Sequence, residues 1–361
     1  MNTNHKALEN LVSLIFQSSG SSIEEAEKIS NHLILSNLVG HDSHGIIRVP
    51  RYIMWLKEGK VNANVKPEIV NDGENIILIN GKGGFGQVVG HFATNLGIQR
   101  SRENGCAIIA IKNSAHLGRI GHWAEIAALE GIISIHFVNT SGLGLLVAPF
   151  GSYERRFSTN PFAAGIPVPN SKPFLLDFAT SVVAEGKMQV ALQGGKPLPE
   201  DSLIDKFGQF TNDPRVVYGN VGNNPLDQRS GKGAIRPMGD HKGSGLSFLC
   251  ELLGGALTGG GAGKLGETKL RNGMLSIFIK PESVTETDSY QNELKRYLDF
   301  FKSAKPAIPG DEVLMPGELE EKTKETRIEH GIQIPEKTWQ QLLIIAKNLK
   351  IDQKEVNKCI I

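Results

Sequence analysis

The chain opens with apolar and polar positions spaced at the period of an α-helix. A segment from about 4 to 19 places its apolar residues on one helical face: Leu8, Leu11, Val12, Ile15 and Phe16. A second helix is expected next, because Ser22 and Glu25 match a capping box and Gly40 can end the helix. The loop HDSHG then leads into a third expected helix over about 48–58.

From about residue 75 the pattern changes to short β-branched runs that alternate with helical segments. The runs NIILIN, CAIIAIKN and GIISIHFVN predict strands, as do 163–168, 174–178 and 274–280. Helices are expected at 88–104, 120–130, 181–193 and 241–257, and again throughout the segment after Pro306. The last of the internal helices carries a leucine stripe that we expect in the core: Leu246, Leu249, Leu253 and Leu257. The polar, glycine-rich stretch 208–234 is expected to be flexible.

This pattern predicts an α/β protein in two parts. Residues 1–65 together with 300–361 are expected to form a helical layer, and residues 66–299 an α/β body beside it.

Composition excludes several classes of protein. The 361 residues are 40% hydrophobic and 21% charged, which is typical of a globular protein. With 39 basic and 38 acidic residues, no general field attracts nucleic acid or anionic lipid. The three cysteines are far apart and form no C-x-x-C, the amino terminus has no apolar signal region, and the stretch LSFLCELLGGAL is too short to span a bilayer. We therefore expect a cytoplasmic protein.

Two glycine-rich motifs suggest nucleotide binding, and both lack essential parts. GKGGFG at 81–86 follows a predicted strand, but the next strand ends in Lys112 and Asn113 instead of the acid that a Rossmann fold uses to hold ribose. TGGGAGKL has Thr258 where a P-loop has its first glycine and Leu265 where it has its magnesium-binding hydroxyl.

The segment SNLVGHDSHGIIRVPRY gathers groups suited to proton transfer and anion binding. His44 can exchange a proton near neutral pH, Ser43 can orient it, and Arg48 can bind a carboxylate through two hydrogen bonds. The same residues also suit a loop that caps helices and forms surface ion pairs, and composition alone does not separate the two interpretations.

Three further segments place polar groups at the ends of predicted elements. In NSAHLGRIGHWAEIAA, His116 and Arg119 lie on a strand-to-helix turn before a helix that begins near Ile120, where α/β proteins bind anions. Asp177 closes an apolar strand, where it can accept ribose hydroxyls or cap the following helix. Lys242 stands in the first turn of a helix, where a bound anion would offset the unfavourable helix dipole.

In this order, the segments resemble the malate/L-lactate dehydrogenase type-2 family, and particularly its hydroxycarboxylate dehydrogenase B branch. The resemblance covers nearly the whole chain and is carried by GHDSHGI, NSAHLGRIGHWAE, SIHF, VAPF, TNPF, LLDFATS, HKGSGL, CELLGGALTGG and LMPGE. It implies a family-specific, non-Rossmann α/β fold with a central mixed sheet flanked by helices. It also implies NAD or NADP as cofactor, a homodimer, and cofactor binding near the subunit boundary.

The resemblance also assigns roles to residues. His44 is implied as proton donor or acceptor with Ser43 beside it, and Arg48 as a ligand of the substrate carboxylate. His116 stands where ureidoglycolate dehydrogenase, a relative, has its proton acceptor, so either histidine can be the acid/base. Cofactor contacts are implied at His44, Gly118, Arg119, Ile120, Leu175, Leu176, Asp177, Phe178, Ala179, Lys242, Asn272, Gly317 and Glu318.

The chain departs from its relatives at two places. Some relatives carry an aromatic residue in place of Ser244, and Ser244 with Phe178 would alter the cofactor pocket. Glu185 and Lys187 occupy the region of an acidic relay residue of imine-reducing relatives, such as piperideine-2-carboxylate reductase, and neither is assigned that role.

We therefore expect hydride transfer between NAD(P) and a small 2-oxo or 2-hydroxy acid, with no bound metal and with no membrane or nucleic acid as partner. A reductase of cyclic imino acids uses the same geometry and is the main alternative. A hydrolase with Ser43 as nucleophile is less favoured, because no G-x-S-x-G elbow surrounds it. A non-catalytic nucleotide sensor would keep the cofactor residues but would tolerate loss of His44. A metal site at His41, His44 and His116 has no tight ligand pair on a helix to support it.

Overall fold

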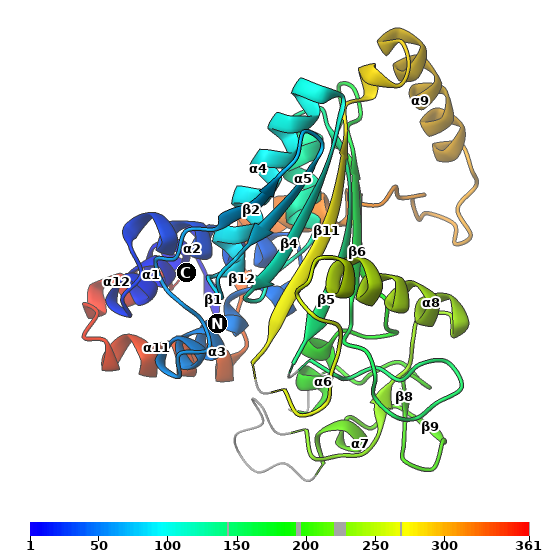
Figure 1. Cartoon of the computed structure of the whole chain (residues 1–361). Coiled ribbons are helices and arrows are strands. Elements are labelled where there is room, and N and C mark those ends of the chain that lie inside the picture. The colour runs from blue at the N-terminus through cyan, green and yellow to red at the C-terminus, as the bar shows by residue number, and fades with distance from the viewer. Residues whose placement is uncertain (143, 193–195, 220–228, 268, 361) are drawn as a thin grey trace.

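A mixed sheet of seven strands forms the centre of the molecule (Figure 1). The computed structural model describes residues 1–142, 144–192, 196–219, 229–267 and 269–360. In spatial order the strands are β2 (Glu68–Asp72), β3 (Ile76–Asn80), β4 (Cys106–Ser114), β11 (Arg271–Ile279), β5 (Ile133–Ser141), β6 (Pro161–Ile166) and β7 (Phe174–Ala179). Only β3 and β4 run parallel among these neighbours, so the expected central mixed sheet is confirmed.

Helices α4 (Gly86–Asn104) and α5 (Gly121–Leu129) pack on the sheet and form a core with it. Ile109 and Ile111 of β4, Phe278 of β11 and Trp123 of α5 are buried in this core. The alternation of apolar residues along β4 puts its buried side chains on one face of the strand, which is why this face accepts helices.

Helix α8 (His241–Cys250) continues into a π-helical segment, η3 (Glu251–Leu257), which packs against β5 and β11. The leucine stripe expected in the core here is wrong, because Leu249 is 39% exposed and Leu257 is 67% exposed. The buried face instead carries small residues. A Cβ on Gly254 would lie 2.9 Å from the backbone N of Asn139, so only glycine allows this close approach to β5.

A second core joins helices from both ends of the chain, at the left of Figure 1. It contains buried residues of α1 (His5–Ser18), α2 (Ile23–Leu38), α3 (Val49–Lys57), α11 (Glu336–Asn348) and α12 (Gln353–Asn357). The short strands β1 (Asn2–Thr3) and β12 (Ile332–Gln333) pair beside it, and α10 (Glu318–His330) packs on α2. The expected helical layer from both termini is present, while the division at residues 65 and 300 stays a prediction.

A group of short elements lies in the lower part of Figure 1, below α8. A small sheet contains β8 (Leu203–Ile204), β9 (Phe210–Thr211) and β10 (Ala234–Ile235), with α6 (Glu185–Leu192) and α7 (Arg215–Tyr218) nearby. The stretch 208–234, expected to be flexible, falls partly outside the described residues.

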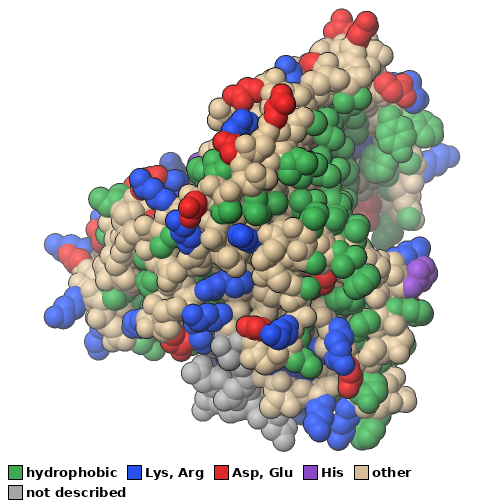
Figure 2. Space-filling model, in the orientation of Figure 1, with side chains coloured by type: hydrophobic (Ala, Val, Ile, Leu, Met, Phe, Trp, Pro, Cys, Tyr) green, Lys and Arg blue, Asp and Glu red, His purple; other side chains and the backbone are tan. Residues whose placement is uncertain are grey.

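Helix α9 (Thr287–Lys302) was not expected from the sequence. It follows the short 3-10 turn η4 (Pro281–Ser283), projects from the body in Figure 1, and has no buried residue. Figure 2 shows hydrophobic side chains gathered on the body next to this helix. No helix in the described ranges has the length and apolarity needed to cross a membrane.

Candidate active site

Two histidines from distant parts of the chain come together beside the sheet. His44 ends the 3-10 turn η1 (Asp42–His44), and His116 follows the end of β4. Their ring centroids are 5.5 Å apart and the ring planes differ by 6°. Within the described part of the chain no hydrogen bond joins the two rings.

The loop that carries His44 is held by Asn37 of α2. The Asn37 side chain accepts a hydrogen bond from Ile46 N at 2.9 Å and donates one to Asp42 at 2.6 Å. Gly45 lies directly on this amide, and any Cβ there would overlap it. Asp42 also pairs with Arg327 of α10 at 2.6 Å. The glycine of Ser43-His44-Gly45 is therefore required by packing, which sets the position of His44.

His44 is neutral at physiological pH and has one ring nitrogen without a partner among the described residues. Its Nδ1 is buried and has no partner among the described residues. Burial, followed by the charges of His116 and Arg48, holds the pKa of His44 well below its ordinary value. A buried nitrogen without a partner is costly unless something absent from the chain itself bonds to it.

The ring of His116 is hydrogen-bonded through Nδ1 to Tyr52 of α3. The Tyr52 hydroxyl lies 2.6 Å from Nδ1 of His116 and 3.2 Å from Nε2 of Gln87, which belongs to α4. Burial, then Arg48 and Arg51, lowers the pKa of His116 well below its ordinary value, while Glu185 opposes this. The second histidine is therefore also neutral at physiological pH.

Arginines surround the histidine pair. Arg48 ends the turn η2 (Ile46–Arg48) and donates from Nε to the Ser43 carbonyl at 2.6 Å. Arg51 is 2% exposed and lies 3.5 Å from Glu185, which also pairs with Arg229 at 2.5 Å. Burial raises the pKa of Glu185, but Arg229, Arg51 and Arg48 outweigh it and the net pKa is lowered. Glu185 is therefore ionised and structurally committed to arginines.

The turn after His116 is anchored from two sides. Leu117 N donates to Oδ1 of the buried Asn272 at 2.8 Å, and Asn272 Nδ2 bonds to β5. Arg119 N donates to Nε2 of His32, a buried residue of α2, at 2.9 Å. Gly118 between them has φ of +78°, and a Cβ there would overlap the His32 ring. Asn272 thus positions this turn and has little bonding capacity left for a cofactor.

Asp177 connects β7 to the start of α5. Its Oδ2 accepts a hydrogen bond from Gly121 N at 2.8 Å, so it caps α5 and not the helix that follows it in sequence. Its second oxygen has no hydrogen-bond partner among the described residues. Ile120, the residue before α5, is buried. The expected cap on the following helix is therefore wrong, because Asp177 caps α5, while contact with a ribose hydroxyl stays a prediction.

The first residues of α10 lie against β7. Leu175 N donates to the Pro316 carbonyl at 3.0 Å, and Gly317, with φ of +100°, packs on Leu175. The Glu318 carboxylate pairs with Lys302 and accepts from Met315 N at 2.7 Å. Leu176, Phe178 and Ala179 continue β7 along β6. The structure thus brings most of the predicted cofactor residues to one end of the sheet, near the start of α5.

Lys242 precedes Gly243, which packs on the backbone of Thr180 directly after β7. Lys242 is exposed in the first turn of α8, where no acidic residue accompanies it. No hydrogen bond or ion pair connects it to the histidine pair within the described ranges. Ser244, two residues on, accepts a hydrogen bond from Phe150 N at 3.0 Å.

These residues fit a dinucleotide that binds outside any Rossmann loop. Nδ1 of His44 and the second oxygen of Asp177 have no hydrogen-bond partner among the described residues and can each bond to such a group. The GKGGFG loop cannot, because its amides bond to the chain itself: Gly81 N and Gly83 N donate to the end of β4 at 2.8 and 2.7 Å. This explains physically why the glycine motif is not a nucleotide fingerprint.

Sequence reasoning missed Tyr52, Gln87, Arg51 and His32 as members of the site. Tyr52 follows Arg48 by four residues, and this spacing places the two side chains on one face of a helix. The sequence could therefore have indicated that Tyr52 lies near Arg48. Gln87 and His32 lie on other helices and reach His116 and its turn only through tertiary packing.

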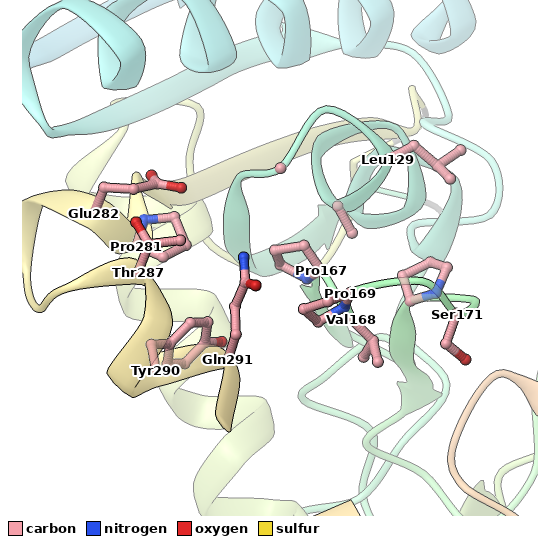
Figure 3. A pocket seen from close by; sticks show the side chains of 13 residues that line it. Leu129, Pro167, Val168, Pro169, Ser171, Pro281, Glu282, Thr287, Tyr290 and Gln291 are labelled. Carbon is pink, nitrogen blue, oxygen red and sulfur yellow. The ribbon is translucent and has the colours of Figure 1, made fainter. Parts of the chain in front are cut away.

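A groove elsewhere on the molecule is separate from this site (Figure 3). It has a volume of about 290 Å³ and lies between the end of α5, the β6–β7 connection and the start of α9. β4 begins at that end, where Cys106 pairs with Ile279, while His116 follows the opposite end of β4. The groove is thus at the far end of the sheet from the histidines.

Comparison with known proteins identifies the chain as an oxidoreductase of the 2-hydroxy acid dehydrogenase type. A family model described as malate/L-lactate dehydrogenase matches residues 3–343. The chain belongs to the malate/L-lactate dehydrogenase family.

Named relatives agree with this assignment. Hydroxycarboxylate dehydrogenase B of Escherichia coli O157:H7 is 37% identical over 97% of this chain and 94% of its own length. The Delta(1)-pyrroline-2-carboxylate/Delta(1)-piperideine-2-carboxylate reductase of Pseudomonas putida is 30% identical over 93% of this chain and 94% of its own. The solved structure of sulfolactate dehydrogenase from Methanocaldococcus jannaschii superposes with a TM-score of 0.86 at 31% identity, covering 98% of this chain and 99% of that one. The family expected from the sequence motifs is confirmed.

Proposed function

We propose that the protein transfers a hydride between a nicotinamide dinucleotide and a small 2-oxo or 2-hydroxy carboxylic acid, with His44 as the group that exchanges the proton. The observation that carries this proposal is the placement of two neutral, half-buried imidazoles beside Arg48. The cofactor supplies or accepts the hydride when it is bound. His44, Gly118, Asp177 and neighbouring backbone would hold it.

Arg48 orients the substrate in this proposal. Its guanidinium binds the carboxylate, and positioning the reacting carbon in this way lowers the barrier by removing translational and rotational freedom beforehand. Arg48 is tied through Nε to the loop of His44, so the carboxylate ligand and the acid/base move as one unit. Ser43, next to His44, packs on Gly186 of α6 and closes this side of the site.

His44 moves the proton. In its neutral form it can accept the hydroxyl proton of a 2-hydroxy acid, because burial has lowered its pKa. In the reverse direction, a histidinium returns that proton to the oxygen on which negative charge develops. A bound substrate carboxylate favours the charged imidazole, so substrate binding itself prepares the reverse step.

His44→Ala tests the assignment. We expect turnover to fall by about 10²- to 10⁴-fold, the usual contribution of general acid–base catalysis, while dinucleotide binding stays measurable by fluorescence titration. The assay follows reduced-nicotinamide absorbance with NADH and NADPH across a panel of 2-oxo acids. His330→Ala, at an exposed histidine, is the matched control. Near-normal turnover of His44→Ala contradicts the proposal and favours a role in binding alone.

A second candidate is reduction of cyclic imino acids, which the 30% identical Pseudomonas putida reductase supports. The same substrate panel, extended to pyrroline- and piperideine-2-carboxylate, separates the two, because the preferred class shows the higher kcat/KM. A Ser43 hydrolase has no support in the geometry, since no hydrogen bond joins Ser43 to His44 among the described residues.

We also propose a homodimer in a cytoplasmic setting. Phe248 and Leu252 on α8–η3 and Tyr297 and Phe300 on α9 are 45–67% exposed, and such apolar surface is suited to contact with a second copy. The three unpaired cysteines fit a reducing compartment. Sedimentation equilibrium tests the dimer: twice the 39.2 kDa chain mass is expected, and a monomer at micromolar concentration contradicts it.

A further inference from the structure

A closed circuit of hydrogen bonds behind His116 determines where its ring proton sits. The circuit begins at the His116 backbone carbonyl, which can only accept. The amide nitrogen of Gln87, Nε2, lies 3.4 Å from this oxygen and donates a hydrogen bond to it. This contact orients the Gln87 amide, because the opposite orientation would bring two acceptor oxygens together; the buried Oε1 has no hydrogen-bond partner among the described residues.

The same Nε2 lies 3.2 Å from the Tyr52 oxygen and donates its second hydrogen to it. Because the Tyr52 oxygen already accepts from Gln87, the phenolic proton is directed at the other close neighbour, Nδ1 of His116, at 2.6 Å. Burial raises the pKa of Tyr52 to about 12, so the phenol keeps this proton at neutral pH. His116 Nδ1 is therefore an acceptor, and in the neutral ring the proton must be on Nε2.

We infer that Tyr52 and Gln87 hold His116 as a neutral hydrogen-bond donor through Nε2, so that His116 polarises the substrate oxygen and His44 alone exchanges the proton. This inference rests on the proposed function. Tyr52 and Gln87 are positioning residues in it, because they act through the ring of His116.

Protonation of His116 would break the circuit. An imidazolium needs an acceptor at Nδ1, and the Tyr52 oxygen would then receive two N–H groups while its own proton lost its partner. The charged groups around the ring agree: Arg48 and Arg51 of η2 and α3 disfavour the imidazolium, and Glu185 of α6, which favours it, is already bonded to arginines. Nδ1 of His44, on the other side, has no hydrogen-bond partner among the described residues.

The test is direct measurement of the ring nitrogens of His116 by long-range proton–nitrogen NMR on histidine-labelled, cofactor-free protein, assigned with His116→Asn. We expect a protonated Nε2 and an unprotonated Nδ1 throughout pH 5.5–8, a window set by the ordinary histidine pKa of about 6.5. A His116 ring that is Nδ1-protonated, or doubly protonated at neutral pH, overturns the inference. This measurement needs no turnover, so its failure is distinguishable from failure of the proposed function.

Substitution of Tyr52 adds a kinetic readout. Tyr52→Phe removes the donor to Nδ1, and we expect kcat to fall about tenfold with dinucleotide KM little changed, as for partial loss of one transition-state hydrogen bond. In the same variant the His116 ionisation moves to higher pH in the NMR titration. Tyr153→Phe, at a tyrosine that is 44% exposed and lies outside the proposed site and dimer surface, is the matched control. An unchanged His116 titration in Tyr52→Phe overturns the inference.

Gln87→Glu reverses the polarity of the circuit. The carboxylate accepts the Tyr52 proton, so the Tyr52 oxygen turns to accept from His116 Nδ1–H, and we expect the Nδ1-protonated or charged ring to appear. Gln87→Met, of similar size but without a hydrogen bond, separates this effect from packing. Persistence of the Nε2–H tautomer in Gln87→Glu contradicts the assigned direction of the hydrogen bonds.

Discussion

Gly118 offers a sharp test of how the turn after His116 is held. Its φ of +78° is unfavourable for any residue with a Cβ, at about 1–2 kcal/mol. A Cβ would also overlap Nε2 of His32, which accepts the hydrogen bond from Arg119 N. Arg119 is 3% exposed, so displacing His32 leaves a buried amide without a partner, at about 1–3 kcal/mol. Gly118→Ala should therefore reduce the free energy of unfolding by about 2–5 kcal/mol.

The matched control is Gly131→Ala, because Gly131 has φ of +79° with nothing within 4 Å of its Cβ position. Urea unfolding followed by circular dichroism should show only the backbone cost of about 1–2 kcal/mol for this control. In the double variant His32→Ala/Gly118→Ala, the cost of the second substitution should shrink, because the overlap is relieved. Equal destabilisation by Gly118→Ala and Gly131→Ala would refute the role of His32.

Three other measurements follow from the described contacts. His136 is fully buried, and burial lowers its pKa to about 3. Because its pKa in the unfolded chain is about 6.5, protonation of the unfolded chain reduces the free energy of unfolding as the pH falls below that value. The loss of stability between pH 7 and 5 should therefore be about 2 kcal/mol smaller in His136→Gln than in the unchanged protein, and an equal loss refutes this. Asn272→Ala leaves the buried Leu117 amide unpaired, so urea unfolding should show a loss of about 1–3 kcal/mol and dinucleotide KM should rise, whereas unchanged values would contradict the anchoring role. Gly254→Ala should destabilise the protein by about 1–3 kcal/mol, because the added Cβ contacts the β5 backbone. Gly245 has open space around it, so Gly245→Ala should stabilise α8 by about 0.5–1 kcal/mol. If both variants shift the midpoint of thermal unfolding in the same direction, the packing argument is contradicted.

The sequence predicted most of the regular elements because their signals are local. The helices expected over 4–19 and 120–130 are α1 at 5–18 and α5 at 121–129, and the strand expected over 106–113 is β4 at 106–114. Apolar periodicity and capping residues determine these segments without help from the rest of the chain.

Where prediction failed, partners distant in sequence decide the outcome. The leucines of α8 have the spacing of a core stripe, but the close approach of Gly254 to β5 makes the small-residue face the buried one. α9 was missed although Tyr290, Leu294 and Leu298 have helical spacing. Helix α9 has no buried residue, so its apolar residues gave no clear sign of a face that packs on the rest of the protein.

The candidate site was predictable in its individual residues and not in its connections. His44, His116 and Arg48 were named from their motifs, and the structure places them together, while their roles stay predictions. The Gln87 and Tyr52 bonds that orient His116 join α3, α4 and the turn after β4, and no single motif contains all three.

The position of β11 in the sheet has a consequence for how the chain folds. β11 lies between β4 and β5, although it follows β5 by about 130 residues, which is the interval from Ser141 to Arg271. Until β11 has been synthesised, β4 and β5 each present an unpaired strand edge, and such edges promote association with other chains. Pairing over this sequence distance also slows folding, because the long loop must close before the contacts form. A nascent or truncated chain that ends before Arg271 therefore exposes the middle of its own sheet, and it is at this stage of synthesis that the protein depends most on protection from aggregation.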